Sequence, residues 1–548
     1  MIFPADAAGR HRQARNHNNV ADPKALILAA RRPPMSSKLT RSFHVVPLSF
    51  GILIVLLALA ALAQISGGQG FQKSPLVLTR STAGEHSQPE GTLLSASGTP
   101  GRAPVSRARG IGLGPMAPDN PLFLPAQPYY LGGGGLAGLV TDMNGDGKLD
   151  LLVSGTDESN GDGSVGVLLG NGDGTLQGPV GYYNTGGQAA APPVVADLNG
   201  DGKPDLVVAE SCASWLGNCT SGDALAGVLL NNGDGTFQPA VVYRTGGYTF
   251  ALSAAVGDVN GDGKPDLVVA DWTCTNGGGE GCVSVLLGNG NGTFQTARTY
   301  DSGGSHTESI VATDVNGDGK LDLLVTNGFG SDSVGVLLGN GDGTFQSSVA
   351  YLSGGDFAKD LLVVDVNHDG KPDLIVTNID SDTIGVLLGK GDGTFRAAKV
   401  YSSGGQGITS IVAADVNGDG TPDLLATNCG AKYGFCGGNG GGVGVLLANG
   451  DGTFRPAVTY DLGGRPVQIE VGDVNADGKQ DLVATVASFG TIGVLLGDGD
   501  GTFQPIVSYD SGLYVDISVR IADMNGDGKL DAVVTGGGAQ VDARWVCC

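Results

Sequence analysis

Residues 258–269 read DVNGDGKPDLVV, and this stretch decides the fold because close variants of it recur along the chain. The pattern DxNGDGxxD begins at Asp142, Asp197, Asp258, Asp314, Asp365, Asp415, Asp473 and Asp523, with 50–61 residues between starts. A repeat of this length indicates an array of similar units that bury their cores against one another. The sequence therefore predicts one repetitive domain over residues 119–548.

Each unit predicts four short antiparallel strands. One apolar run precedes the motif, as at 254–256, and a second follows it, as at 267–269. Such near-continuous apolar runs are typical of strands buried on both faces. A VGVLL-type segment and an FQPAVVY-type segment (237–243) come next, and the NGDG between them is a strong hairpin signal. Four strands in about 50 residues, repeated, predict the blades of an all-β propeller.

The number of hairpins indicates how the ring closes. The LLGNGDGTF-type hairpin occurs seven times, with its leucine pair starting at Leu168, Leu229, Leu286, Leu337, Leu387, Leu446 and Leu495. The missing fourth strand matches 123–129, and the missing third strand fits 541–546. We expect the last blade to combine both ends of the domain, which leaves no open edge. Eight blades are favoured, and seven are the alternative.

The repeated motif has the chemistry of a calcium loop. Positions 1, 3, 5 and 9 carry oxygen donors, position 7 offers its backbone carbonyl, and Gly at position 6 permits a sharp turn. Oxygen-only donors favour Ca²⁺, with up to eight ions predicted. The predicted ligands are Asp142, Asn144, Asp146, Lys148, Asp150, Asp197, Asn199, Asp201, Lys203, Asp205, Asp258, Asn260, Asp262, Lys264, Asp266, Asp314, Asn316, Asp318, Lys320, Asp322, Asp365, Asn367, Asp369, Lys371, Asp373, Asp415, Asn417, Asp419, Thr421, Asp423, Asp473, Asn475, Asp477, Lys479, Asp481, Asp523, Asn525, Asp527, Lys529 and Asp531.

Three copies depart from the pattern without losing a ligand atom. His368 and Ala476 replace the Gly at position 4, and Thr421 replaces the usual Lys at position 7. The alternative is a set of Asx-rich turns without an ion. Three carboxylates in each loop would then repel one another, which favours calcium. The GNGDGT hairpins, in contrast, are interpreted as plain turns.

Repeated eight times, DVNGDGKPDLVV resembles the FG-GAP/VCBS repeat, which forms the blades of the integrin α-subunit propeller and of many bacterial surface proteins. The resemblance covers residues 119–548 and implies a propeller with calcium in the turns between the first and second strands. It also implies a role in adhesion or ligand binding, without naming a ligand.

The amino-terminal region predicts export. Residues 48–63 are apolar, Lys38 and Arg41 precede them, and Ala61-Leu62-Ala63 resembles a cleavage site. We interpret 35–63 as a signal peptide, with an uncleaved anchor as the alternative, and 1–34 as an unstructured extension or a mis-assigned start. Residues 64–118 are a Ser/Gly/Pro-rich linker. The mature chain would then be secreted or held at the cell surface, with no membrane span if the signal is cleaved.

Cysteines and charge agree with an exported binding protein. The pairs Cys212/Cys219, Cys274/Cys282 and Cys429/Cys436 predict short disulfides, and no CxxC spacing supports a metal site instead. The net charge of −24 argues against nucleic acid as a partner.

Loops on the other face of the ring carry Trp215, Tyr248 and Trp272, which could form an aromatic ligand site or pack as small loop cores. We expect a module that binds a glycan or a protein. A polysaccharide lyase or hydrolase, or a purely structural calcium-rigidified spacer, is the alternative.

Overall fold

The computed structural model describes residues 122–131, 134–157, 161–188, 190–210, 223–274, 279–431, 440–487, 490–513, 515–537 and 542–546. All secondary-structure elements in these ranges are strands, and they belong to the compact unit Ser49–Cys548. Within the same ranges, no helix has the length and apolar character needed to cross a membrane. The predicted extension, signal peptide and linker, residues 1–118, lie outside the described residues.

The strands form six four-stranded sheets and one seven-stranded sheet, all antiparallel. The four-stranded sheets are β2(Gly134–Thr141)–β3(Asp150–Thr156)–β4(Asp162–Leu168)–β5(Gly181–Gln188), β13(Thr307–Thr313)–β14(Asp322–Asn327)–β15(Ser333–Leu337)–β16(Val349–Leu352), β17(Ala358–Val364)–β18(Asp373–Asn378)–β19(Thr383–Leu387)–β20(Lys399–Ser402), β21(Ile408–Ala414)–β22(Asp423–Asn428)–β23(Gly441–Leu446)–β24(Val458–Gly464), β25(Pro466–Gly472)–β26(Asp481–Val486)–β27(Thr491–Leu495)–β28(Val507–Asp510) and β29(Val515–Ala522)–β30(Asp531–Gly537)–β31(Asp542–Val546)–β1(Gln127–Tyr130).

The seven-stranded sheet has the order β12(Arg298–Ser305)–β11(Glu280–Leu286)–β10(Asp266–Thr273)–β9(Val241–Gly257)–β8(Asp223–Leu229)–β7(Asp205–Glu210)–β6(Val194–Ala196). Its central strand β9 is 17 residues long. The first half of β9 pairs with β8, from Val241 to Tyr248, and the second half pairs with β10, from Tyr248 to Gly257. One continuous strand therefore joins two sets of strands that the repeat would otherwise keep apart.

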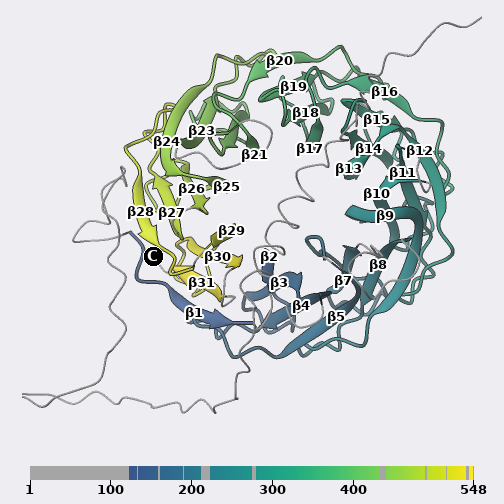
Figure 1. The fold of residues 1–548 in the computed structure, drawn as a ribbon, viewed down its shortest axis with the longest axis horizontal. Coiled ribbons are helices and arrows are strands. Elements are labelled where there is room, and N and C mark those ends of the chain that lie inside the picture. Colours follow the sequence, from purple (N-terminus) through teal and green to yellow (C-terminus); the bar gives the residue numbers. More distant parts are fainter. Residues whose placement is uncertain are drawn as a thin grey trace, which may run out of the picture. The chain divides into compact units, whose positions relative to one another are not determined.

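The sheets follow one another around a ring (Figure 1). First strands such as β13, β17 and β21 lie toward the centre, and last strands such as β16, β20 and β24 lie at the rim. This arrangement confirms the predicted all-β propeller built from four-stranded blades.

Closure by both ends of the domain is also confirmed. Strand β1 pairs with β31, with Gln127 opposite Trp545 and Tyr130 opposite Asp542. The same sheet continues through β30 to β29. The predicted segments 123–129 and 541–546 thus overlap the strands that complete this sheet.

Burial differs between the first two strands of each sheet. Every residue of the second strands β14, β18 and β22 is buried, as their apolar sequences predict. The first strands β13, β17 and β21 instead share a pattern in which only the first and fourth of seven residues are buried. The prediction that first strands are buried on both faces was therefore wrong, because one face of each lines the inside of the ring.

Aromatic pairs join neighbouring repeats at regular intervals. In each pair a tyrosine meets a phenylalanine edge-on, with ring centroids 5.3–5.5 Å apart: Tyr183–Phe237, Tyr243–Phe294, Tyr300–Phe345, Tyr351–Phe395, Tyr401–Phe454, Tyr460–Phe503 and Tyr509–Phe123. Between β1 and the β4–β5 hairpin, the Tyr129 hydroxyl accepts the Leu176 N–H at 2.9 Å. Edge-to-face pairs stabilise by about 0.5–1.5 kcal/mol beyond burial, so these contacts hold the ring together.

We predict that Phe123→Ala destabilises the propeller by about 3–5 kcal/mol, because this ring is 1% exposed and fills the contact with Tyr509. Urea unfolding followed by circular dichroism measures the loss. The matched control is Leu124→Ala, since the neighbouring Leu124 is 54% exposed and should cost little. Equal effects of the two substitutions would contradict a closing role for this segment.

Candidate functional site

The acidic motif forms a tight turn between the first and second strands of each sheet. In the loop 258–266, Asp258 accepts the N–H groups of Gly261 at 2.7 Å, Asp262 at 3.1 Å and Gly263 at 2.7 Å. Asn260 Oδ1 accepts the Asp262 N–H at 2.8 Å. Asp262 Oδ1 in turn accepts the Lys264 N–H at 3.0 Å. Backbone N–H groups therefore fold the loop around the side chains at positions 1, 3 and 5.

The ninth-position aspartate has a different role, because it is fully buried. One oxygen of Asp266 accepts the Val259 N–H at 3.0 Å inside its own loop. The other oxygen accepts the Gly288 N–H at 2.7 Å, from the hairpin between the third and fourth strands. The same pair of bonds is made by Asp150, Asp205, Asp322, Asp373, Asp423 and Asp481. This carboxylate fastens the two turns together and confirms that they share one face, called here the lower face.

Burial raises the pKa of the Asp266 carboxyl, and the nearby Asp262 and Asp258 carboxylates raise it further. The two N–H bonds act in the opposite direction. Asp266 is thus held close to two other carboxylates of its loop, so any positive charge placed among them would be stabilising.

The lysine at position 7 of the loop provides part of this positive charge. The ammonium of the position-7 lysine lies 3.2–3.9 Å from the position-5 carboxylate in six loops: Lys148–Asp146, Lys203–Asp201, Lys264–Asp262, Lys320–Asp318, Lys371–Asp369 and Lys479–Asp477. Both partners of each pair are at least about a third exposed, so each pair contributes only about 0–1 kcal/mol.

These hydrogen bonds and ion pairs determine which of the predicted calcium ligands are accessible to an ion. In the described part of the chain, no three His, Cys, Asp or Glu side chains converge closely enough to hold a metal ion. Both oxygens of the ninth-position carboxylate already accept buried N–H groups. The side-chain oxygens at positions 1, 3 and 5 lie at the surface, and hard oxygen donors of this kind fit Ca²⁺. Calcium therefore stays a prediction, with positions 1, 3, 5 and 7 as the accessible donors.

Position 4 of the loop needs a left-handed backbone as much as position 6 does. Its φ is 73–77° at Gly145, Gly200, Gly261, Gly317, Gly418 and Gly526. His368 and Ala476 adopt the same conformation, with φ of 57° and 60°. The two departures from the motif thus keep the loop geometry, but each places a Cβ where glycine is favoured.

The aromatic residues predicted to bind a ligand do not gather as expected. Trp215 lies outside the described residues. The Trp272 ring contacts Phe250, His306 and Phe329, with centroids 5.3, 4.9 and 6.4 Å away. Tyr248 is joined to this region through its backbone carbonyl, which accepts the Thr273 hydroxyl at 3.0 Å. The structure therefore extends the aromatic group away from Tyr248, toward β13 and β14.

Two acids in the second strands, Glu210 of β7 and Asp271 of β10, are buried inside the sheet toward the face opposite the acidic turns, called here the upper face. Glu210 and Asp271 are 0% exposed. Burial raises the pKa of Glu210 to about 8 and that of Asp271 to about 7. The hydroxyls of Thr245 and Ser284 donate to the two oxygens of Asp271.

Neutral side chains occupy the same strand position in three other sheets. Asn327, Asn378 and Asn428 end β14, β18 and β22 as Glu210 ends β7, and each donates Nδ2 to a backbone carbonyl at 3.1–3.5 Å. The repeat therefore accepts an uncharged amide where these acids lie.

The predicted cysteine pairs have three outcomes. Cys212 and Cys219 lie outside the described residues. Cys429 is buried and disulfide-bonded, but its predicted partner Cys436 is not described, so that pairing stays a prediction. Cys274 and Cys282 are free thiols in this structure. Asp271 lies opposite Cys282 in the ladder, while the Cys274 N–H donates to the Glu280 carbonyl at 2.8 Å. The Cys274 side chain hydrogen-bonds to the Cys282 thiol, so a disulfide between them stays a prediction.

Sequence reasoning missed charges on the inner strands. Arg520 of β29 and Glu470 of β25 form an ion pair with an N–O distance of 2.6 Å. Glu308 of β13 lies near Lys359 and Asp360 of β17, and burial raises the pKa of Glu308 to about 7. Charged residues within otherwise apolar first strands were the available signal.

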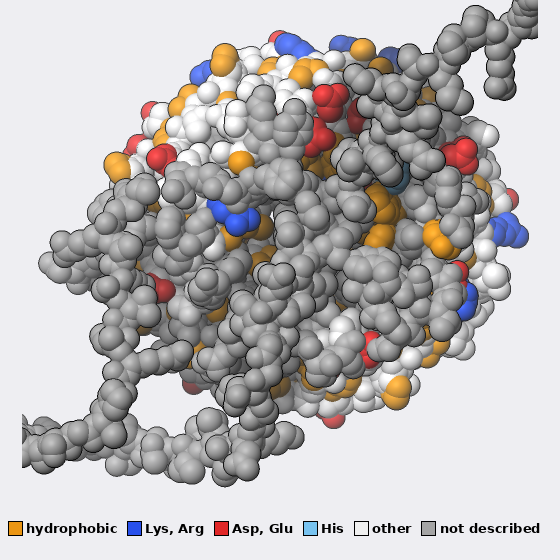
Figure 2. All heavy atoms as spheres, viewed as in Figure 1, with side chains coloured by type: hydrophobic (Ala, Val, Ile, Leu, Met, Phe, Trp, Pro, Cys, Tyr) orange, Lys and Arg blue, Asp and Glu red, His pale blue; other side chains and the backbone are white. Residues whose placement is uncertain are grey.

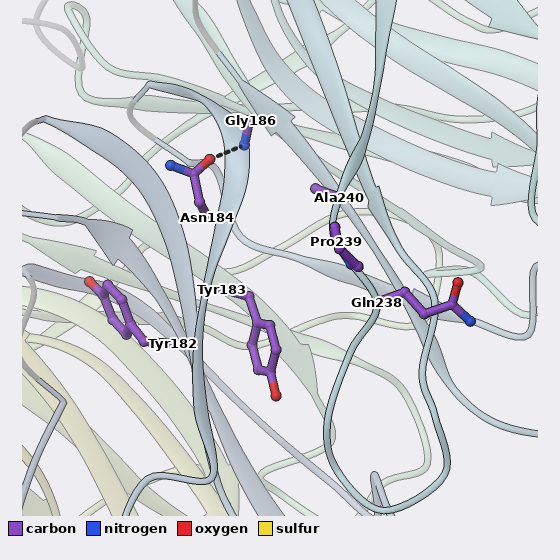
Figure 3. A pocket seen from close by; sticks show the side chains of 7 residues that line it. All are labelled: Tyr182, Tyr183, Asn184, Gly186, Gln238, Pro239 and Ala240. Atoms are coloured by element: carbon purple, nitrogen blue, oxygen red, sulfur yellow. Dashed lines mark hydrogen bonds between the residues drawn. The ribbon is translucent and has the colours of Figure 1, made fainter.

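A hollow on the outside of the ring lies between β5 and the approach to β9 (Figure 3). Tyr182, Tyr183, Asn184, Gly186, Gln238, Pro239 and Ala240 line it. Asn184 Oδ1 accepts the Gly186 N–H at 2.7 Å, and Tyr183 packs on Phe237. None of these side chains is charged at pH 7, so we assign no chemistry to this hollow.

The fold and its lower face define a repeat β-propeller whose turns carry clustered carboxylates. The FG-GAP-like repeat matches residues 142–208, 218–269, 270–325, 314–376, 365–426, 435–484 and 473–534. The chain therefore belongs to the FG-GAP-like repeat family. Among curated proteins, no sequence matches it.

Several solved structures resemble the chain at low identity. The periplasmic gluconolactonase PpgL of Pseudomonas aeruginosa is 16% identical, with a TM-score of 0.47, over 73% of this chain and 99% of that one. Sqt1 from Chaetomium thermophilum is 11% identical, with a TM-score of 0.46, over 77% and 99%. The V. cholerae biofilm matrix protein Bap1 is 14% identical, with a TM-score of 0.34, over 79% and 90%.

We predict that Ala476→Gly stabilises the propeller by about 1 kcal/mol, because glycine relieves the left-handed conformation at φ 60°. Chemical denaturation of the two proteins measures the difference. The reverse change at the equivalent position, Gly317→Ala, should destabilise by a similar or larger amount. A loss of stability in Ala476→Gly would contradict the strain argument.

We predict that Glu210→Gln removes part of the pH dependence of stability. The folded protein holds this proton up to about pH 8, whereas an unfolded glutamate releases it near pH 4.5. The free energy of unfolding should therefore fall as pH rises from about 4.5 to 8. At pH 9 the variant should be more stable than the parent by at least about 1 kcal/mol. The control Glu280→Gln, at an exposed position, should leave the pH profile unchanged.

Proposed function

We propose that this chain is an exported, calcium-loaded propeller of eight blades that acts as an adhesion or ligand-binding module for a glycan or a protein. The observation that carries the proposal is the repetition of surface carboxylate loops on the lower face. The other face is left to loops that differ from blade to blade. Variable loops on a fixed scaffold are where binding residues are usually found.

The count of eight rests on how β9 is interpreted. If its two halves belong to neighbouring blades, the seven-stranded sheet contributes two blades, and the six four-stranded sheets contribute one each. The series of tyrosine contacts supports this interpretation. The Tyr129–Leu176 contact adds one to the seven aromatic pairs, so each interface between consecutive blades has a contact.

Calcium would bind at the acidic loops, where carboxylates lie close together. The side-chain oxygens of Asp314, Asn316 and Asp318 in one loop would bind the ion, together with the carbonyl of Lys320. The Lys320 ammonium now lies 3.4 Å from Asp318, and its exposed side chain can move aside. A bound ion would neutralise the loop and stabilise the turn against repulsion.

Export and disulfides complete the proposal. Residues 35–63 would direct the chain out of the cytoplasm, where extracellular calcium suffices for sites with dissociation constants of about 0.1–1 mM. The same compartment would keep the bond at Cys429 oxidised. We propose that the module binds its ligand without catalysing a reaction.

We predict that calcium raises the melting temperature and that excess chelator lowers it markedly. Each site stabilises by about 2.7 kcal/mol at a free ion level of 100 times its dissociation constant. Asp318→Asn should lower the number of ions bound by one in calorimetric titration, because a carboxylate donor is lost.

Asp342→Asn is the matched control in the same repeat. Asp342 bonds only to Thr344, and Asn291 makes the same bonds to Thr293 in another hairpin. This variant loses an equal charge and should bind the full number of ions. An unchanged melting curve in excess chelator, with no ions bound in the titration, would refute the calcium proposal.

A further inference from the structure

Two backbone positions recur on the upper face next to the start of each first strand. The carbonyls of His306, Phe357, Gly407 and Arg465 each accept the N–H that follows the second strand, at 2.9–3.0 Å. These four residues are therefore equivalent. By the same comparison, Phe329 is equivalent to Gly430, because each follows the residue that donates this N–H.

His306, Phe357 and Phe329 place large rings on a left-handed backbone that favours glycine, a conformation that the equivalent Arg465 and Asp380 do not adopt. The φ angles are 55° at His306, 60° at Phe357 and 35° at Phe329. The equivalent glycines Gly407 and Gly430 have φ of 70° and 84°. The blade that contains Gly407 and Gly430 thus folds without a side chain at either position. Rings held at a cost of about 1–2 kcal/mol each indicate a use other than folding.

The rings form one group, called here the upper aromatic cluster: Phe250, Trp272, His306, Phe329 and Phe357. Successive ring centroids are 5.3, 4.9, 5.3 and 4.6 Å apart along the series. All but Phe357 are half-buried, so part of each ring meets solvent. In Figure 2, hydrophobic side chains and a histidine gather over β9, β10 and β13.

Two nitrogen atoms in the cluster lack a hydrogen-bond partner. Trp272 Nε1, which can only donate, and His306 Nδ1 are both buried and unpaired within the described residues. Buried polar atoms without a partner are rare, and a bound ligand or water is a usual explanation.

Carboxylates border the cluster on one side. Asp332 Oδ1 accepts the Phe357 N–H at 2.8 Å, and the Asp380 N–H donates to the Asp356 carbonyl at 3.2 Å. Asp332, Asp356 and Asp382 are all close enough to raise the pKa of Asp380, after burial. Figure 2 shows acidic side chains over β18 and β19, beside the apolar group. Ring faces, unpaired nitrogens and acceptor oxygens therefore adjoin one another.

We propose that the upper aromatic cluster, with its bordering aspartates, binds a neutral sugar ring of a glycan. A pyranose presents apolar C–H faces to aromatic rings, and its hydroxyls both donate and accept hydrogen bonds. Its hydroxyls could accept from Trp272 Nε1 and donate to Asp380. The charged groups of a cationic peptide are donors only and cannot pair with the indole N–H, and acidic sugars would be repelled by the aspartates. The inference rests on the proposed binding function and names its ligand class and location.

The test measures binding of neutral glucan, mannan and galactan oligosaccharides to the full chain with calcium. An oligogalacturonate and an oligoarginine peptide are the comparison probes. The double variant His306→Gly with Phe329→Gly removes two rings and installs the residue that Gly407 and Gly430 show the fold accepts. We expect a neutral oligosaccharide to bind the parent and the double variant to bind at least about 30-fold more weakly. Its melting temperature should be unchanged or higher.

Two further variants separate binding from folding. Trp272→Phe keeps a ring but removes the N–H, and should weaken binding about 5–10-fold without a change in calcium affinity. Leu352→Ala, at a 73% exposed position on the rim, should bind as the parent does. The inference is overturned if the double variant binds within threefold of the parent, or if the parent prefers the acidic or cationic probe. Binding of those probes, or of a protein, would leave the broader proposed function standing, whereas a parent that binds none of these ligands would refute both.

Discussion

One buried carboxylate in each repeat is the constraint on which the structure depends. The ninth-position aspartate ties the acidic turn to the neighbouring hairpin through two backbone N–H groups, as Asp266 does with Val259 and Gly288. Removing a carboxylate from water is costly unless its oxygens are paired, so the two turns cannot separate without leaving it unpaired. The four strands of a repeat thereby share one fixed end, and tyrosine contacts such as Tyr300–Phe345 then join one sheet to the next. At the opposite end, the loops differ in sequence from blade to blade.

The fold was largely predictable because local signals agree with one another. The motif, the NGDG hairpin and the apolar runs each indicate the same strand order, and counting them located the closure between β1 and β31. Two features were not predictable because they depend on the closed ring. The first strands are only partly buried because they border the space inside the ring. No local sequence pattern reveals that space. Strand β9 continues through Tyr248, where other repeats have a break between the last strand of one blade and the first strand of the next. The sequence at Tyr248 resembles the sequence at those breaks.

The site was less predictable than the fold. The motif places the lower carboxylates correctly, but it does not reveal that Asp266 bonds to a hairpin 22 residues away. On the upper face, Trp272 and Phe329 are 57 residues apart in sequence and meet only because neighbouring blades lie side by side. The informative signal was the replacement of glycine by a ring at His306 and Phe329. That replacement is recognised only when the repeats are aligned by their hydrogen bonds.

The pairing of β1 with β31 has a mechanical consequence. Gln127, at the start of β1, lies opposite Trp545, near the end of β31. Tension applied between the two ends of the domain would therefore load one end of this short ladder and peel its hydrogen bonds in succession. Sheets loaded along their length share the force among all their bonds at once. Under such a pull the ring would open first at its own seam, while the blades bordering it kept their strands.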